Sequence, residues 1–151
     1  MTELLDTLRA PILLAATVAT GLQAGTYYTW ASGVMPGLAK VDDRAFVSSM
    51  NHINVAIVNP VFMLTFLGAP ALAAAAVATT TGGARTWAIA GLACALGTVA
   101  VTAMGNVPLN DALAAGGSRA DFETVWVRWN VVRTATSAGA LACLAWAAWK
   151  S

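Results

Sequence analysis

Residues 53–78, INVAIVNPVFMLTFLGAPALAAAAVA, run without one charged side chain and decide the fold of this 151-residue chain. About 20 apolar residues is the length that an α-helix needs to cross a hydrocarbon core about 30 Å thick. Comparable runs lie on both sides of it, at roughly 10–31, 86–105 and 131–149. The pattern predicts an all-α, integral membrane four-helix bundle that crosses the bilayer four times.

The composition indicates that residues 1–151 form a single membrane domain. Hydrophobic residues make up 58% of the chain and charged residues only 10%, about half the usual charged share. No segment outside the four runs is long enough to bury a soluble core of its own. The net charge is +1 with no basic run, so no nucleic-acid partner is indicated. We therefore expect a multi-pass protein of the cell membrane whose main partner is the lipid bilayer.

The ends of the helices follow from caps and prolines. The helix that contains the decisive run is expected to begin near Asp43, outside the membrane. The third helix is expected to end at Gly105, because Pro108 lacks an N–H donor and disfavours helix in the residue before it. The fourth helix is expected to begin around 121–124 and to end at Lys150.

Small residues in the runs suggest how the helices pack. Gly21 and Gly25 have the GxxxG spacing that lets a second helix approach closely, which indicates packing within the chain or a homo-oligomer through these glycines. Cys94 and Cys143 are single thiols without the spacing of a zinc or redox motif. Both are expected to pack as small apolar residues, and their shared depth leaves a bridge between them geometrically open.

Polar side chains gather at the end of the bundle that carries the two longer connections. On the second helix they share an arc of about 160°, and on the fourth an arc of about 100°, at about 100° per residue. Because three helices present polar groups to the same end, the sequence predicts one pocket. The candidates are Asn51, His52, Asn54 and Asn59 on the second helix, Asn106, Asn110 and Asp111 at the end of the third, and Trp126, Trp129, Asn130 and Arg133 on the fourth.

Each of these candidates also has a purely structural explanation. An arginine on the buried side of a membrane helix must be paired or hydrated, so Arg133 either caps carbonyls, pairs with Asp111 or meets a substrate anion. The asparagines can hydrogen-bond neighbouring helices. His52 is the natural proton acceptor because histidine titrates near neutral pH, although a lone histidine is more often structural.

Metal chemistry is disfavoured by the available ligands. One histidine, no carboxylate within a span and two separated thiols do not supply three protein ligands. We therefore expect no metal, with haem bound through His52 as the alternative. A proton-coupled transporter is also disfavoured, since no acidic residue lies within a span.

Four segments together resemble a family of small four-span membrane proteins that includes the anthrone oxygenases of aromatic polyketide pathways. They are Gly21-Leu-Gln-Ala-Gly25, Met50-Asn-His-Ile-Asn54 running to Asn59-Pro60, Asn106-Val-Pro-Leu-Asn110, and Trp126 through Trp129-Asn130 to Arg133. The resemblance covers most of the chain. It implies oxidation of a lipophilic, anthrone-type aromatic by molecular oxygen, without flavin, haem or metal. The family pattern has Gln more often where Asn51 stands, and it does not include His52.

The implied reaction assigns roles to the pocket residues. It needs a base to take a proton from the activated methylene and donors to hold the resulting oxyanion. We expect His52 or Asp111 as the base, with the remaining candidates binding substrate. The donors would be Arg133, Asn106, Asn110 and Asn130, the walls Trp126 and Trp129. The competing class is a non-enzymatic membrane subunit, or a binding protein for a lipophilic metabolite, in which these side chains only lock the helices together.

Overall fold

A computed structural model describes residues 2–151, and these residues form helices and no strand. The order along the chain is α1 (Thr2–Thr29), η1 (Trp30–Val34), α2 (Met35–Leu38), α3 (Asp43–Ala56), α4 (Pro60–Thr79), α5 (Gly82–Val101), η2 (Thr102–Asn106), α6 (Val107–Ala114) and α7 (Arg119–Lys150). The segments η1 and η2 are π-helical turns that continue the helices before them.

Within residues 2–151, three helices are long and apolar enough to cross a membrane: Pro60–Thr79, Gly82–Ala114 and Arg119–Lys150. They confirm the predicted all-α membrane bundle. The expected first span, 10–31, lies in α1, which is 28 residues long but is not among the three. Polar side chains such as Gln23 and Tyr27 lower the mean hydropathy of α1. The count of four crossings therefore stays a prediction.

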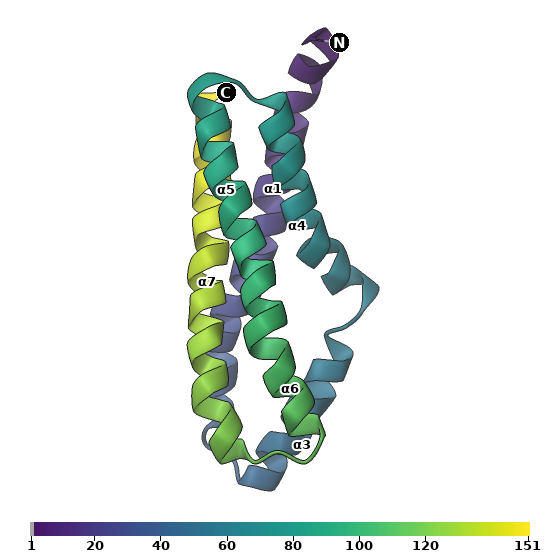
Figure 1. Ribbon diagram of the computed structural model, residues 1–151, viewed down its shortest axis with the longest axis vertical. Coiled ribbons are helices and arrows are strands. Elements are labelled where there is room, and N and C mark those ends of the chain that lie inside the picture. Colours follow the sequence, from purple (N-terminus) through teal and green to yellow (C-terminus); the bar gives the residue numbers. More distant parts are fainter. Residues whose placement is uncertain (1) are drawn as a thin grey trace.

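The long helices α1, α4, α5 and α7 lie side by side (Figure 1), and each contacts two of the others. Both termini and the short turn between α4 and α5 lie at one end of the bundle, and α3 and α6 lie at the opposite end. The terminal end has an alanine-rich core around Leu13 and Leu144. The opposite end has a bulkier core that includes Phe46, Phe122 and Trp126. Trp126 is also one of the candidate site residues.

The second helix is interrupted, contrary to the continuous helix predicted from Asp43 through residue 78. It ends at Ala56 and resumes at Pro60 as α4. Pro60 has no N–H and disfavours helix in the residue before it. Asn59 is accordingly extended (φ −125°, ψ 161°), and its Oδ1 accepts the N–H of Phe62 at 3.0 Å as the N-cap of α4.

The third helix, predicted to end at Gly105, continues through η2 and α6 to Ala114. Within η2 the N–H of Val107 bonds the carbonyl of Thr102, five residues earlier. The wider π turn leaves room for the ring of Pro108, which would clash in an α-helical turn. The first helix repeats this arrangement, since η1 precedes Pro36. Proline is thus absorbed into both helices and does not end them.

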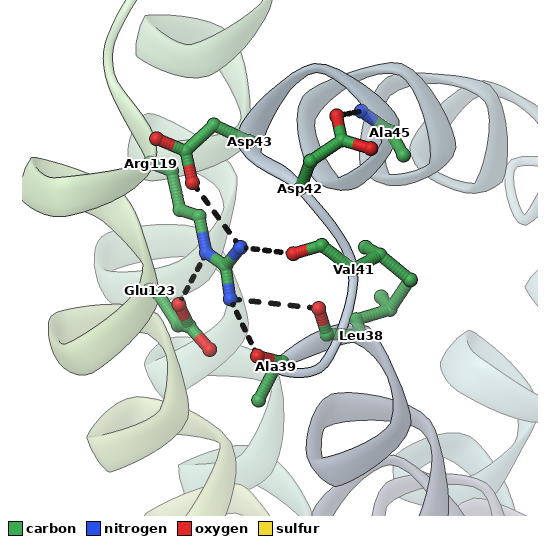
Figure 2. A network of polar contacts seen from close by, with 8 residues as sticks. All are labelled: Leu38, Ala39, Val41, Asp42, Asp43, Ala45, Arg119 and Glu123. Atoms are coloured by element: carbon green, nitrogen blue, oxygen red, sulfur yellow. Dashed lines mark hydrogen bonds and ion pairs between the residues drawn. The ribbon is translucent and has the colours of Figure 1, made fainter.

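A single arginine fastens the connection between α2 and α3 to the start of α7 (Figure 2). Arg119 donates to the carbonyls of Leu38, Ala39 and Val41, and it pairs with Asp43 at 3.2 Å and Glu123 at 2.7 Å. Its guanidinium also lies 4.5 Å from the ring centre of Phe46. The contacts with the Ala39 and Val41 carbonyls satisfy acceptors at the end of a short helix that have no backbone donor.

Within residues 2–151, no other helix packs closely against Gly21 and Gly25. A Cβ at Gly25 would meet nothing within 4 Å, and one at Gly21 would meet only Leu141 Cδ1 at 3.6 Å. The homo-oligomer through these glycines stays a prediction. Cys94 and Cys143 are both free thiols, half-buried in α5 and α7, as their expected role in packing requires.

Candidate functional site

A cavity of about 300 Å³ lies where α1, α3, α4, η2, α6 and α7 meet. Most of its lining is apolar or aromatic, with a few polar groups, as is usual for a small-molecule site. The lining residues are Thr26, Tyr27, Trp30, Asn54, Ile57, Val58, Phe62, Met63, Phe66, Thr102, Val107, Asn110, Trp126 and Arg133.

Arg133 carries the only positive charge in this lining, and its side chain is held from three sides. The residue is 7% exposed. Its Nε donates to Asn130 Oδ1 at 2.9 Å, and its Cζ lies 4.5 Å from the ring centre of Tyr27 and 4.8 Å from that of Trp126. Asn130 is itself fixed, because its Nδ2 donates to the Tyr27 carbonyl at 3.3 Å. Stacking between two aromatic faces partly offsets the burial of the cation.

The charge of Arg133 has no counter-ion within ion-pair distance among residues 2–151. The expected pairing with Asp111 is not formed, because Asp111 is exposed on α6. The terminal nitrogens Nη1 and Nη2 donate to no acceptor in the described part of the chain. Of the explanations offered by the sequence, an acceptor supplied by a ligand in the cavity fits this geometry best.

The cavity walls are aromatic on two sides. The ring centres of Trp30 and Trp126 lie 5.1 Å apart with their planes tilted by 54°, and Trp126 Nε1 donates to Asn110 Oδ1 at 2.8 Å. From α4, Phe62 and Phe66 stack with centres 5.6 Å apart and planes 15° apart. With Tyr27, five aromatic rings surround this space, and they favour a flat, apolar ligand.

Two further polar atoms at the cavity have no partner. Tyr27 Oη and Asn54 Nδ2 are both buried and make no hydrogen bond of standard geometry within residues 2–151, although the Thr102 hydroxyl lies close to Tyr27 Oη. The two lining threonines differ, since Thr26 and Thr102 donate to carbonyls of their own helices at 2.8 Å.

The structure brings together four of the predicted site residues, Asn54, Asn110, Trp126 and Arg133, in the cavity lining. Asn106 and Asn130 are fully buried behind it and donate to the carbonyls of Trp126 and Tyr27. The remaining predicted residues, Asn51, His52, Asn59, Asp111 and Trp129, are not part of the lining.

Three of the residues outside the lining have structural contacts of their own. His52 is exposed, and its Nδ1 lies 2.7 Å from the Ser48 carbonyl one turn earlier. Asn59 caps α4. Trp129 is 39% exposed and packs over Gly105. Neither expected base, His52 or Asp111, therefore borders the cavity.

Sequence reasoning missed the contribution of the first helix. Tyr27 and Trp30 lie three residues apart on one face at the end of the run 10–31, a position that interfacial aromatic residues also occupy. The sequence feature that could have identified them is their depth in the membrane. The end of the run 10–31 and the start of the run 131–149, which carries Arg133, lie at the same end of the bundle. Phe62, Met63 and Phe66 were missed because an apolar residue in a span carries no sign of which space it faces.

Metal ligands do not gather in the described residues. Within residues 2–151, no three His, Cys, Asp or Glu side chains lie close enough to hold a metal ion. His52, the residue considered for haem, lies outside the cavity lining.

Comparison with protein families gives a match over the second, third and fourth long helices. Residues 50–143 match the family described as anthrone oxygenase, and this stretch is more than half of the chain. It contains Asn54, Asn110, Trp126 and Arg133, whereas Tyr27 and Trp30 precede it. No curated protein and no solved structure gives a match.

Proposed function

Since the chain belongs to the anthrone oxygenase family, we propose that it is a membrane-embedded oxygenase of the cell membrane, which oxidises a lipophilic, anthrone-type aromatic with molecular oxygen and no bound cofactor. The observation that carries this proposal is Arg133. A cation without a counter-ion, clamped in an aromatic cavity, is suited to a flat ligand that develops negative charge on an oxygen.

The reaction divides into two steps. Removal of a proton from the methylene of an anthrone leaves an anion. Its charge lies largely on the carbonyl oxygen attached to the opposite carbon of the central ring. This electron-rich anion reacts directly with dioxygen. One oxygen atom becomes the new carbonyl of the quinone, and the other leaves as water with the two methylene hydrogens, so the substrate supplies all the electrons.

Arg133 would act on the first step. Its terminal nitrogens would donate to the developing oxyanion, and the low polarity around them would strengthen that interaction. Asn130 would hold the guanidinium in place through the 2.9 Å bond to Nε. Asn110 would fix the Trp126 wall by accepting its indole N–H.

The proton takes a route that differs from the one expected from sequence. No carboxylate or imidazole among the described residues lines the cavity. The proton from the methylene would therefore pass to water. The protein would then work by binding and by stabilising the anion, and not through His52 or Asp111 as a base.

The test is oxygen uptake by the purified, detergent-solubilised protein after addition of emodin anthrone, with a visible spectrum recorded first. We expect a colourless protein that accelerates uptake, and a loss of about 100-fold or more in Arg133→Met. Arg128→Met is the matched control, because Arg128 is exposed on the same helix. A folded Arg133→Met protein with full activity would overturn the proposal.

The absence of a carboxylate or imidazole from the described lining also favours a second candidate, a binding protein for a lipophilic aromatic metabolite. The same experiment separates the two. Saturable binding without any acceleration of oxygen uptake would support the binding protein.

A further inference from the structure

We propose that Tyr27 and Asn54 form a donor pair that holds an oxygen atom of the ligand, and that the cavity therefore selects planar aromatics bearing a carbonyl or phenolate oxygen. This inference rests on the proposed ligand class and identifies two residues that recognise it. It holds whether the ligand is oxidised or only bound.

The buried atoms without partners divide by chemistry. Five side-chain atoms within residues 2–151 are buried without a hydrogen bond. The two at the cavity, Tyr27 Oη and Asn54 Nδ2, are groups that can donate a proton. The other three are amide oxygens, which can only accept, and they belong to residues outside this lining: Gln23, Asn51 and Asn106. The cavity thus concentrates unused donors.

Tyr27 is fixed in place by contacts of its backbone and its ring, and its hydroxyl lies close to the Thr102 hydroxyl without forming a hydrogen bond of standard geometry. It is 2% exposed, its carbonyl accepts from Asn130, and its ring lies against the Arg133 guanidinium. A buried hydroxyl without a partner is unfavourable, so an acceptor from the ligand would satisfy it.

Asn54 approaches from a different helix. It lies on α3, one turn before the interruption at residues 57–59, whereas Tyr27 lies on α1. Ile57 and Val58 in that interruption continue the lining. The two donors lie on separate helices, α1 and α3, and both residues line the same cavity as Arg133.

The experiment compares two flat probes of similar shape, anthraquinone and anthracene, which differ in the presence of oxygen acceptors. Binding is followed by quenching of tryptophan fluorescence, since Trp30 and Trp126 border the cavity. The measured quantity is the ratio of the two affinities, in which differences in partitioning into detergent cancel between variants. We expect the wild-type protein to prefer anthraquinone.

Tyr27→Phe should reduce this ratio about fivefold, the loss expected for one net hydrogen bond. Tyr28→Phe is the matched control, because it removes the same hydroxyl from the neighbouring residue, which is 63% exposed and outside the lining. Its ratio should equal that of the wild type. Asn54→Leu should reduce the ratio by a similar factor and provides an independent variant.

An unchanged ratio in both Tyr27→Phe and Asn54→Leu would overturn the inference, as would a wild-type protein that binds neither probe or prefers anthracene. Oxygen uptake is read separately. If the wild-type protein consumes no oxygen and the variants lose their preference for anthraquinone, the donor pair is supported and the oxygenase is rejected. If the wild-type protein consumes oxygen and both variants keep the wild-type affinity ratio, the oxygenase is supported and the donor pair is rejected.

Discussion

Replacing Gly105 by alanine tests how η2 and α7 fit together. Gly105 is buried in the π turn, and a Cβ there would lie 2.6 Å from Trp129 Cδ2, 2.7 Å from Cγ and 3.0 Å from Cε2. Carbon atoms in contact prefer about 3.5–4.0 Å, so the indole would have to retreat by about 1 Å. Cγ is bonded to the Cβ of Trp129, and it cannot move that far without a rotation of the whole side chain.

Overpacking of this kind costs about 1–3 kcal/mol. Alanine recovers up to about 1 kcal/mol, because it is favoured over glycine in a helix. The net expectation is a destabilisation of about 1–2 kcal/mol, or about 2–8 °C in Tm for a chain of this size. Gly97→Ala is the control on the same helix, where a Cβ would lie 3.8 Å from Thr136 Cγ2, an ordinary contact. That variant should be as stable as the wild type or slightly more stable.

The assay is thermal unfolding in detergent followed by a thiol-reactive fluorescent dye. Cys94 and Cys143 are free and half-buried within α5 and α7, so labelling should rise as the bundle opens. If Gly105→Ala melts at or above the wild-type temperature while Gly97→Ala behaves as expected, the indole of Trp129 moves freely and the packing argument is wrong.

Three further predictions concern residues at the same end of the bundle. Asn59→Ala removes the N-cap of α4 and should destabilise the protein by about 1 kcal/mol, with faster hydrogen exchange confined to the first turn of α4; an unchanged exchange rate there would contradict the cap. Arg119→Met should speed exchange at residues 39–43, whereas Arg128→Met should not, and equal effects would show that the clamp is unimportant. His52→Ala and Asp111→Asn should each retain wild-type oxygen uptake with emodin anthrone, because neither residue lines the cavity; a loss of about 100-fold or more in a folded variant would identify that residue as the base.

The sequence was sufficient for the fold class because hydropathy reports burial in lipid directly. Runs such as 53–78 and 86–105 lie largely in helices that meet the requirements for crossing a membrane. The prolines were harder to interpret. Pro60 interrupts a helix and Pro108 does not, and the difference depends on whether the preceding turn can widen into a π turn, which a local sequence pattern does not reveal.

The candidate site was predictable on α7 and much less so elsewhere. Arg133 and Asn130 stand out because a charge and an amide on a membrane helix require partners. The partners themselves, Tyr27 and Trp126, depend on which helices become neighbours. His52 stood out by residue type alone, and its position on α3 turns it away from the cavity lining.

The cavity is built from segments that span nearly the whole sequence, from Thr26 to Arg133. Any ligand that fills it can bind only when these segments are assembled, so occupancy and folding are thermodynamically linked. At a concentration of 100 Kd such a ligand would stabilise the bundle by about 2.7 kcal/mol. Melting temperature thus becomes a search tool, because compounds could be ranked as ligands of this protein before any reaction is assayed.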